Sequence, residues 1–276
     1  MQSAFQSTVR IALAFISWAV FTIPLSAASP VYVGKKSSAG SSMDKIDHTP
    51  WSQLLSKYVD SDGKVNYQLW KSTAADVLAL EQYLQHLSDA SAAVSATRAS
   101  KLSFWINAYN AVTVRGILRE FPTSSIRNHT AKIWGYNIWQ DLQLHVGGKP
   151  YSLEQIEHQV LRKMSEPRIH FAIVCASLGC PRLLNAAYLP ATLNEQLETN
   201  SRDFFSRPQN FRHDIAGKRF YLSSILDWFA TDFGNGQKAQ LAKIAKWLPT
   251  QSASDAAKKG AITVSHLGYD WSLNDQ

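Results

Sequence analysis

Residues 168–181 read Arg168-Ile-His-Phe-Ala-Ile-Val-Cys-Ala-Ser-Leu-Gly-Cys-Pro181, and this stretch decides the fold that we expect. Its first half has the alternation of a β-strand, in which successive side chains point to opposite faces of a sheet. Both faces are apolar apart from His170, which is typical of a strand buried on both sides. Gly179 and Pro181 end the pattern. The stretch therefore predicts a buried central strand at 169–175 that runs into a loop.

The rest of the chain predicts several helices around a small sheet. A helix near 96–120 is expected to be buried, because residues 104–112 are apolar nearly all round. Residues 142–151 alternate apolar and polar side chains around a Gly-Gly turn, which indicates a β-hairpin. Further helices are expected at 50–58, 73–88, 152–164, 192–207, 225–233 and 237–247, and short strands at 219–222 and 261–265. The predicted fold is a single α+β domain with a small mixed sheet packed against several helices.

Two segments fit the capping box, in which an N-cap Ser or Thr and a Glu or Gln three residues later exchange hydrogen bonds with the backbone. They are Ser152 with Gln155 and Thr192 with Glu195. We expect each box to begin a helix.

Residues 1–28 have the features of a secretory signal peptide. A basic residue precedes thirteen apolar residues, and small residues follow them. This apolar run is shorter than the roughly 20 residues that a membrane-spanning helix needs. We expect cleavage after Ala27 or Ala28 and export to the periplasm or the exterior, with an uncleaved anchor helix as the alternative. Residues 29–46 are expected to form a flexible leader, and residues 47–276 the single domain.

The charge of the chain is basic but scattered. It has 28 Lys and Arg against 21 Asp and Glu, a formal net charge of +7, and no run of basic residues longer than two. Scattered charge does not favour nucleic-acid binding. A basic exported protein favours acidic partners such as cell-wall polymers or lipid head groups. We expect a small-molecule, peptide or cell-envelope ligand, no nucleic acid, and no membrane span after signal cleavage.

The two cysteines of the chain, Cys175 and Cys180, have four residues between them. In an exported protein they could form a disulfide, which would stabilise the fold by roughly 2 kcal/mol. Alternatively, one of them is a nucleophile whose pKa a nearby base lowers from about 8.5. On a strand, His170 and Cys175 would point to opposite faces about 16 Å apart. The base would then come from another element, with His158 as one option, and the sequence does not choose between the cysteines.

Polar residues elsewhere offer further candidates. Asn107 and Asn110 lie in the buried helix, where an amide without a partner costs about 1–3 kcal/mol. They either brace the backbone of a neighbouring loop or line the site and orient a ligand or a catalytic histidine. A metal site is another alternative, because Glu154 and His158 share a helix face and His170 could approach them. No four-ligand cluster is visible in the sequence, so we expect no metal and no cofactor.

The motifs Phe104-Trp-Ile-Asn-Ala-Tyr-Asn110 and His170-Phe-Ala-Ile-Val-Cys-Ala-Ser-Leu-Gly-Cys-Pro181 resemble the domain of unknown function 547 family. Similar segments between residues 48 and 274 are Ile156-Glu-His158 with Arg162, Ile225-Leu-Asp-Trp228 with Asp232-Phe233, and Tyr269-Asp-Trp-Ser-Leu-Asn274. By position, the resemblance implies a polar signature at Asn107, Asn110, Glu157, His158, His170, Cys175, Cys180 and Asp227. The chain departs from the pattern at Ala176, where glycine is expected, and a Cβ there constrains the loop if φ is positive. The resemblance implies no established reaction.

Two functions are compatible with these residues. The first is an exported thiol-dependent hydrolase or acyl transferase with papain-like or transglutaminase-like chemistry. Either cysteine would be its nucleophile, either histidine its base, and either asparagine would orient that base or bind the oxyanion. Glu157 joins this site through the resemblance alone. The second is a non-enzymatic periplasmic or cell-envelope binding protein with a loop locked by a Cys175–Cys180 disulfide.

Overall fold

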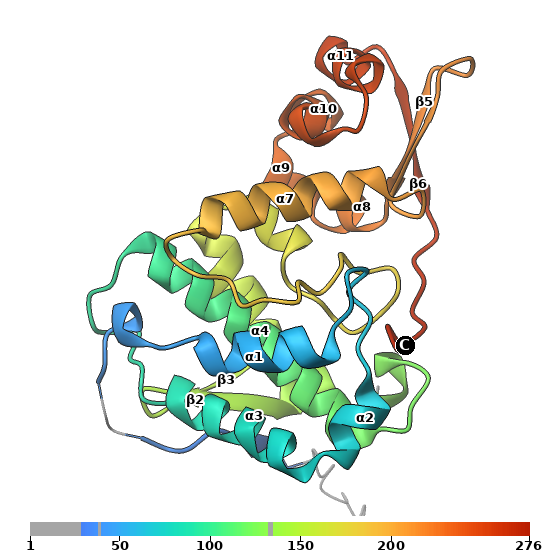
Figure 1. Ribbon diagram of the computed structural model, residues 1–276. Coiled ribbons are helices and arrows are strands. Elements are labelled where there is room, and N and C mark those ends of the chain that lie inside the picture. The colour runs from blue at the N-terminus through green and yellow to red at the C-terminus, as the bar shows by residue number, and fades with distance from the viewer. Residues whose placement is uncertain (1–28, 38–39, 132–134) are drawn as a thin grey trace, which may run out of the picture.

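Figure 1 shows the computed structural model, which describes residues 29–37, 40–131 and 135–276. The predicted signal peptide lies outside the described residues. Within the predicted leader, strand β1 (Val31–Val33) pairs in parallel with strand β2 (Leu142–Val146), and a 3-10 helix, η1, covers Met43–Lys45. β1 is therefore part of a sheet, although its three residues are too few to give a strand pattern in the sequence.

Helix α4 (Arg98–Glu120) is the central element of the broad lower part of the molecule (Figure 1). The Thr97 hydroxyl accepts a hydrogen bond from the Ser100 N–H and caps its first turn. Both polar and apolar residues of its centre are buried, so the predicted buried helix is confirmed. Helices α1 (Thr49–Tyr58), α2 (Tyr67–Ser72) and α3 (Ala74–Leu87) precede it, and α3 packs against both α1 and α4.

The strands form two small mixed sheets of three strands each. In the first, β2 lies between β1 and β3 (Lys149–Ser152), with which it is antiparallel. In the second, β5 (Arg219–Ser223) lies between antiparallel β4 (Phe211–Asp214) and parallel β6 (Thr263–Leu267). The fold is α+β, as predicted, and the hairpin at 142–151 is confirmed.

The predicted central strand at 169–175 is wrong. Residues Pro167–Phe171 form a 3-10 helix, η5, and the residues up to Cys180 form a loop without ladder partners of their own in either sheet. Pro167 takes the first helical position and the Glu166 side chain caps the turn by accepting from the Arg168 N–H. Residues 169–174 are all buried. A short buried run gives the same apolar pattern whether it is a strand or another conformation.

The remaining helices carry the chain from the lower to the upper part. The predicted helix at 152–164 is present as α6 (Leu153–Gln155), a π-helical turn η3 (Ile156–Leu161) and a 3-10 turn η4 (Arg162–Met164). Its capping box is confirmed, whereas the hydroxyl of Thr192 makes no capping bond. The other helices of the described residues, in chain order, are η2 (Ile126–His129), α5 (Ile138–Asp141), α7 (Leu193–Ser206), α8 (Ile225–Trp228), α9 (Ala230–Phe233), α10 (Gln237–Ile244), η6 (Ala245–Trp247) and α11 (Gln251–Lys259).

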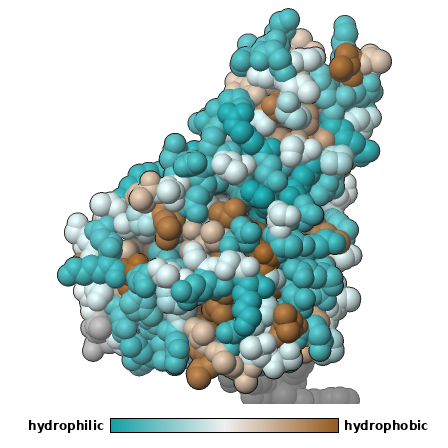
Figure 2. All heavy atoms as spheres, viewed as in Figure 1, coloured by the Kyte–Doolittle hydropathy of each residue, from teal (hydrophilic) through white to brown (hydrophobic). Residues whose placement is uncertain are grey.

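Buried apolar side chains form two clusters, one around α1–α4 and the first sheet and one around α7–α11 and the second sheet. Tyr269 packs against both. The face seen in Figure 1 is mostly hydrophilic, with separate small hydrophobic patches (Figure 2). Among residues 29–37, 40–131 and 135–276, no helix is long and apolar enough to cross a membrane.

After β6 the chain returns to the lower part, where it ends (Figure 1). The returning C-terminal segment, residues 268–276, binds the cysteine loop, residues 172–180. The Leu178 N–H donates to Ser272 O (2.8 Å) and the Asn274 N–H donates to Ala176 O (3.1 Å). On its other side, the Val65 N–H donates to Asn274 O (2.9 Å). The C-terminal segment therefore holds the cysteine loop against the turn that follows α1.

Candidate functional site

A cavity of about 330 Å³ lies between the π-helical turn η3, the cysteine loop, α8 and the C-terminal segment. It brings together side chains that are far apart in the sequence. Five of the seven predicted site residues line it: Glu157, His158, His170, Cys175 and Cys180. The two asparagines do not.

The two thiols lie side by side in the cavity wall. Cys175 is half-buried, Cys180 is buried, and both are free cysteines. Their sulfur atoms are 2.6 Å apart, which is farther than the roughly 2.05 Å of a disulfide bond but closer than two sulfur atoms without a covalent bond ordinarily approach. Ala176, between them, has a φ of 58°. Because this φ is positive, the Cβ of Ala176 constrains the loop, as expected from the sequence for a positive φ. This turn brings the two cysteines together.

Hydrogen bonds around Cys180 favour its thiolate. The backbone N–H of Cys175 donates to the Cys180 Sγ (3.0 Å), and the Tyr269 hydroxyl (3.0 Å) and the Ser177 hydroxyl (3.4 Å) lie within hydrogen-bond distance of it. Burial raises the pKa of Cys180, but the hydrogen bonds from the Cys175 thiol, Ser177 and Tyr269 outweigh burial and hold this pKa below its ordinary value. The hydrogen bond to Cys180, together with burial, raises the pKa of Cys175. Cys180 is therefore the more acidic thiol.

His170 is fixed by a carboxylate and an aromatic ring. Its Nε2 is 2.8 Å from the Oδ2 of Asp232, and its ring stacks on Phe229 with centroids 4.1 Å apart. Arg162 binds the same carboxylate through two hydrogen bonds of 2.6 and 2.8 Å. Because a carboxylate only accepts hydrogen bonds, Nε2 carries the proton and Nδ1 keeps a lone pair. Burial lowers the pKa of His170 to about 4, although Asp232 opposes this shift.

Glu157 is a carboxyl group that exchanges its proton near neutral pH. It lies on the π-helical turn, a conformation that is frequent at functional sites, and the Tyr109 hydroxyl lies 3.4 Å from its Oε2. Burial raises the pKa of Glu157 to about 7, the hydrogen bond from Tyr109 opposes this, and a negative charge on Cys180 adds to it. The next residue, His158, lies at the cavity edge and accepts a hydrogen bond from Arg162 on Nδ1 (3.1 Å).

Asn107 and Asn110 bind backbone instead of the cavity. The Asn110 side chain donates to Ala172 O (3.0 Å) and accepts from the Val174 N–H (2.9 Å). Asn107 does the same with the carbonyl and the N–H of Tyr188, at 2.8 and 2.9 Å. These bonds agree with the bracing interpretation, and Asn110 braces the segment that leads into Cys175.

Asp227, which the resemblance adds to the signature, lies away from the thiols. Its side chain is 62% exposed, and the His266 Nδ1 lies 4.0 Å from its Oδ1. It lines another cavity, beside α9 and β6.

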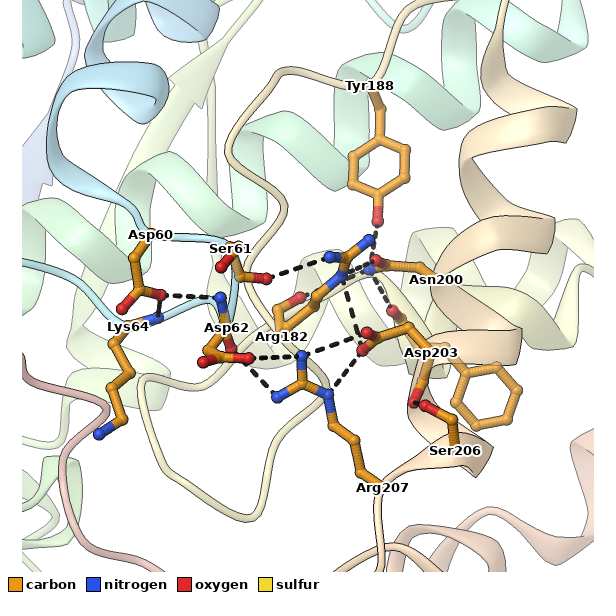
Figure 3. Close-up of polar contacts among 11 residues, drawn as sticks. Asp60, Ser61, Asp62, Lys64, Arg182, Tyr188, Asn200, Asp203, Ser206 and Arg207 are labelled. Atoms are coloured by element: carbon orange, nitrogen blue, oxygen red, sulfur yellow. Dashed lines mark hydrogen bonds and ion pairs between the residues drawn. The ribbon is translucent and has the colours of Figure 1, made fainter. Parts of the chain in front are cut away.

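A polar network lies around Arg182, two residues after Cys180, and Figure 3 shows its side chains. Asp203 on α7 binds Arg207 (2.8 Å) and lies 3.5 Å from Arg182, and Arg182 also donates to Asn200 (3.0 Å) and to Ser61 O (3.1 Å). The network joins the residues after Cys180 to α7 and to the turn after α1. It borders a second cavity of about 280 Å³ that also reaches Cys180.

Sequence reasoning did not select Asp232, Tyr269 or Tyr109 as site residues, although each contacts one of the predicted groups. Asp232 and Tyr269 occur in segments that carry the family resemblance, and Tyr109 lies inside its first motif. These motifs were the only signal that could have identified them, because Asp232 is 62 residues from His170 and Tyr269 is 89 residues from Cys180.

In the described part of the chain, no group of three or more His, Cys, Asp or Glu side chains is arranged to hold a metal ion. Comparisons with curated proteins and with solved structures found no match. A family model described as "Protein of unknown function, DUF547" matches residues 94–205, which include both cysteines, His170, Glu157 and the two asparagines. Asp232 and Tyr269 lie beyond the match. The chain therefore contains a DUF547 domain at residues 94–205.

Proposed function

We propose that this protein is an exported, thiol-dependent hydrolase or acyl transferase with Cys180 as its nucleophile. The observation that carries the proposal is the hydrogen bonding around Cys180 in the wall of a cavity that also holds Glu157 and His170. A thiol of lowered pKa is a thiolate at neutral pH, and the thiolate is the nucleophilic form of cysteine.

The reaction would proceed in two steps. The Cys180 thiolate attacks a carbonyl carbon, a C–S bond forms, and the bond from that carbon to the leaving group breaks. Glu157 in its protonated form gives its proton to the leaving group, a role for which a pKa of about 7 is well matched. Water or another acceptor then attacks the thioester, gives a proton to Glu157, and releases Cys180. His170, whose Nδ1 keeps its lone pair, is the second candidate base.

Acylation of the enzyme tests this proposal directly. The purified, reduced protein is incubated with p-nitrophenyl acetate, digested and analysed by mass spectrometry. We expect one acetyl group on Cys180 and a burst of p-nitrophenol, both lost in Cys180→Ser and retained at least in part in Cys175→Ser. Iodoacetamide labelling should give a midpoint for Cys180 well below about 8.5. Equal labelling of both cysteines with midpoints near that value would contradict a thiolate nucleophile.

A second candidate function is a cell-envelope binding protein with a locked loop. The 2.6 Å between the two sulfur atoms favours it, because a small movement would bring them to bonding distance in an oxidising compartment. Native protein isolated without reductant distinguishes the two. A mass two hydrogens below that of the dithiol, with no alkylation before reduction, would support the locked loop and exclude a free thiol nucleophile.

Export itself remains part of the proposal. It rests on the pattern of residues 1–28. Fractionation of expressing cells and N-terminal sequencing of the isolated protein test it: we expect the protein outside the cytoplasm and a new N-terminus at Ala28 or Ser29. Cytoplasmic protein that retains residue 1 would contradict it.

A further inference from the structure

The charged residues that line the cavity are unusual for a basic chain. Glu154 and Glu157 both line it, and no Lys or Arg is among the described residues of its wall. Arg162 lies beside it, but this guanidinium is bound by the Asp232 carboxylate. His158 and His170 both have lowered pKa values and are neutral at pH 7. In a protein with a formal net charge of +7, the described wall of this cavity carries acidic side chains without a lysine or arginine, and its negative charge grows as Glu157 loses its proton near pH 7.

The remainder of the wall is largely aromatic. Six rings line the cavity: Tyr109, Trp139, Trp228, Phe229, Tyr269 and Trp271. Trp228 is 48% exposed, and its ring centroid lies 4.9 Å from that of Tyr269 and 5.9 Å from that of Trp271. An exposed tryptophan that is held by other rings keeps a face available for a ligand, whereas Phe229 is already covered by His170 and Arg162.

Aromatic faces and carboxylates attract the same kind of ligand group. The face of a tryptophan or tyrosine ring carries negative potential and binds ammonium groups, and a carboxylate pairs with them. Arg127 already lies over the Trp271 ring, 5.2 Å from its centroid, so one face of this aromatic group binds a cation within the protein itself. A neutral apolar ligand would use the rings but would bring no positive charge to the two carboxyl groups.

We infer that the cavity binds an alkylammonium group, and that an amine is the acyl acceptor or part of the acyl donor at Cys180. The inference rests on the proposed function for the chemistry at the sulfur atom. The binding of the amine rests on the lining of the cavity alone, so the two are tested separately.

The transfer step balances with the groups present. An ammonium group that binds beside Glu157 gives one proton to its carboxylate and becomes a free amine. The amine nitrogen attacks the thioester carbon on Cys180, an N–C bond forms, the C–S bond breaks, and the second proton passes from nitrogen to sulfur. The products are an amide, a protonated Glu157 and a Cys180 thiol.

Binding is measured by calorimetry and tryptophan fluorescence with n-butylammonium chloride as the probe and 1-butanol as its neutral analogue. No acyl donor is present, so the result does not depend on catalysis. We expect n-butylammonium to bind at least about tenfold more tightly than 1-butanol, and to bind more tightly as Glu157 loses its proton near pH 7. Equal affinity for the two probes, or no saturable binding of n-butylammonium, would overturn the inference.

Variants with matched controls localise the binding. Glu157→Gln together with Glu154→Gln should weaken n-butylammonium binding about tenfold, whereas Glu195→Gln, an exposed residue on α7, should not change it. Trp228→Ala should weaken it several-fold, and Tyr32→Ala, at a 53% exposed ring in β1, should not. Equal effects in the cavity variants and their controls would count against this cavity. Amine binding without acetylation of Cys180 would refute the proposed enzyme but retain the amine site.

Discussion

Ala176 illustrates how a single residue shapes the site. It is buried, it has a φ of 58°, and it separates Cys175 from the turn that ends at Cys180. A non-glycine residue in this left-handed region costs about 1–2 kcal/mol. The C-terminal segment holds the conformation, because the Asn274 N–H donates to Ala176 O. The family resemblance placed a glycine at this position, and the positive φ explains why glycine suits it.

Ala176→Gly is therefore expected to leave the free energy of unfolding within about 1 kcal/mol of the wild-type value. Relief of the strained φ and the greater flexibility of glycine in the unfolded chain act in opposite directions. Ala111→Gly, at an equally buried position inside α4, should cost about 1 kcal/mol or more. Urea denaturation compares the two variants, and an equal loss in both would show that the positive φ carries no strain.

Glu157 and His170 predict opposing pH dependences of stability. The folded pKa of His170, about 4, is below its ordinary 6.5, so stability is lost as pH falls from 6.5 toward 4, because the unfolded chain binds the proton first. The folded pKa of Glu157, about 7, is above its ordinary 4.5, so stability is lost as pH rises from 4.5 through 7. Between pH 4.5 and 6.5 the gain in stability from His170 and the loss from Glu157 as pH rises offset each other.

Glu157→Gln removes the pH dependence of stability that is due to Glu157 and leaves the one due to His170. The variant should become more stable relative to the wild type as pH rises from 4.5 through 7, by about 2 kcal/mol at the upper end. Its own stability should increase with pH over the range in which His170 titrates. Urea denaturation at several pH values measures both, with the exposed Glu195→Gln as the control. A constant difference between variant and wild type across this range would show that Glu157 titrates normally.

At the scale of elements, the periodicity of apolar residues predicted the helices and strands whose pattern spans many residues. The buried helix α4, the hairpin β2–β3 and the capped helix after Ser152 were all predicted. The segment 169–175 was not, because its backbone groups are bound by side chains from distant helices instead of by neighbouring strands. Asn110 binds Ala172 and Val174, and Asn200 binds Phe171 O (2.9 Å). An alternation of apolar side chains does not indicate which distant groups bind the backbone of a segment.

The role of α4 in this arrangement is testable at Asn110. Asn110→Ala leaves a buried carbonyl and a buried N–H without the Asn110 side chain as partner. At about 1–3 kcal/mol each, we expect a loss of about 2–6 kcal/mol in urea denaturation. Asn128→Ala removes an exposed amide that binds the hydroxyls of Thr123 and Ser124, and should cost less than about 0.5 kcal/mol. A loss at Asn110 as small as that at Asn128 would show that the loop does not depend on α4.

At the scale of the whole molecule, the site is assembled from segments that local patterns treat separately. The cysteine loop, η3, α8 and the C-terminal segment line the cavity, and α9 supplies Asp232, which binds His170. The sequence identified the cysteines, Glu157 and the histidines as candidates. The periodicity of a strand or a helix face, however, places only residues that are close in sequence relative to one another. The partnership of His170 with Asp232, or of Cys180 with Tyr269, follows from tertiary packing, and only the family motifs pointed to these segments.

The C-terminal segment connects the site to the rest of the fold, so its removal should change the chemistry of Cys180. Deletion of residues 272–276 removes the acceptor of the Leu178 N–H, the donor to Ala176 O and the acceptor of the Val65 N–H. Tyr269 and the hydrogen bond from the Gly179 N–H to Asp270 O (2.8 Å) remain, so the loop stays attached beside the hydroxyl by fewer backbone hydrogen bonds. We expect faster amide exchange at residues 176–179 and 59–67, and a rise of the iodoacetamide midpoint of Cys180 toward about 8.5.

Deletion of residues 29–33, which include β1, is the control of equal length, because this strand pairs with β2 and with no part of the cysteine loop. It should leave both the labelling midpoint and the exchange of residues 176–179 unchanged. If the C-terminal deletion also leaves them unchanged, the cysteine loop holds its own conformation. The low pKa of Cys180 would then depend on contacts inside the loop, chiefly those with the Cys175 thiol and Ser177, and not on the return of the chain from the second sheet.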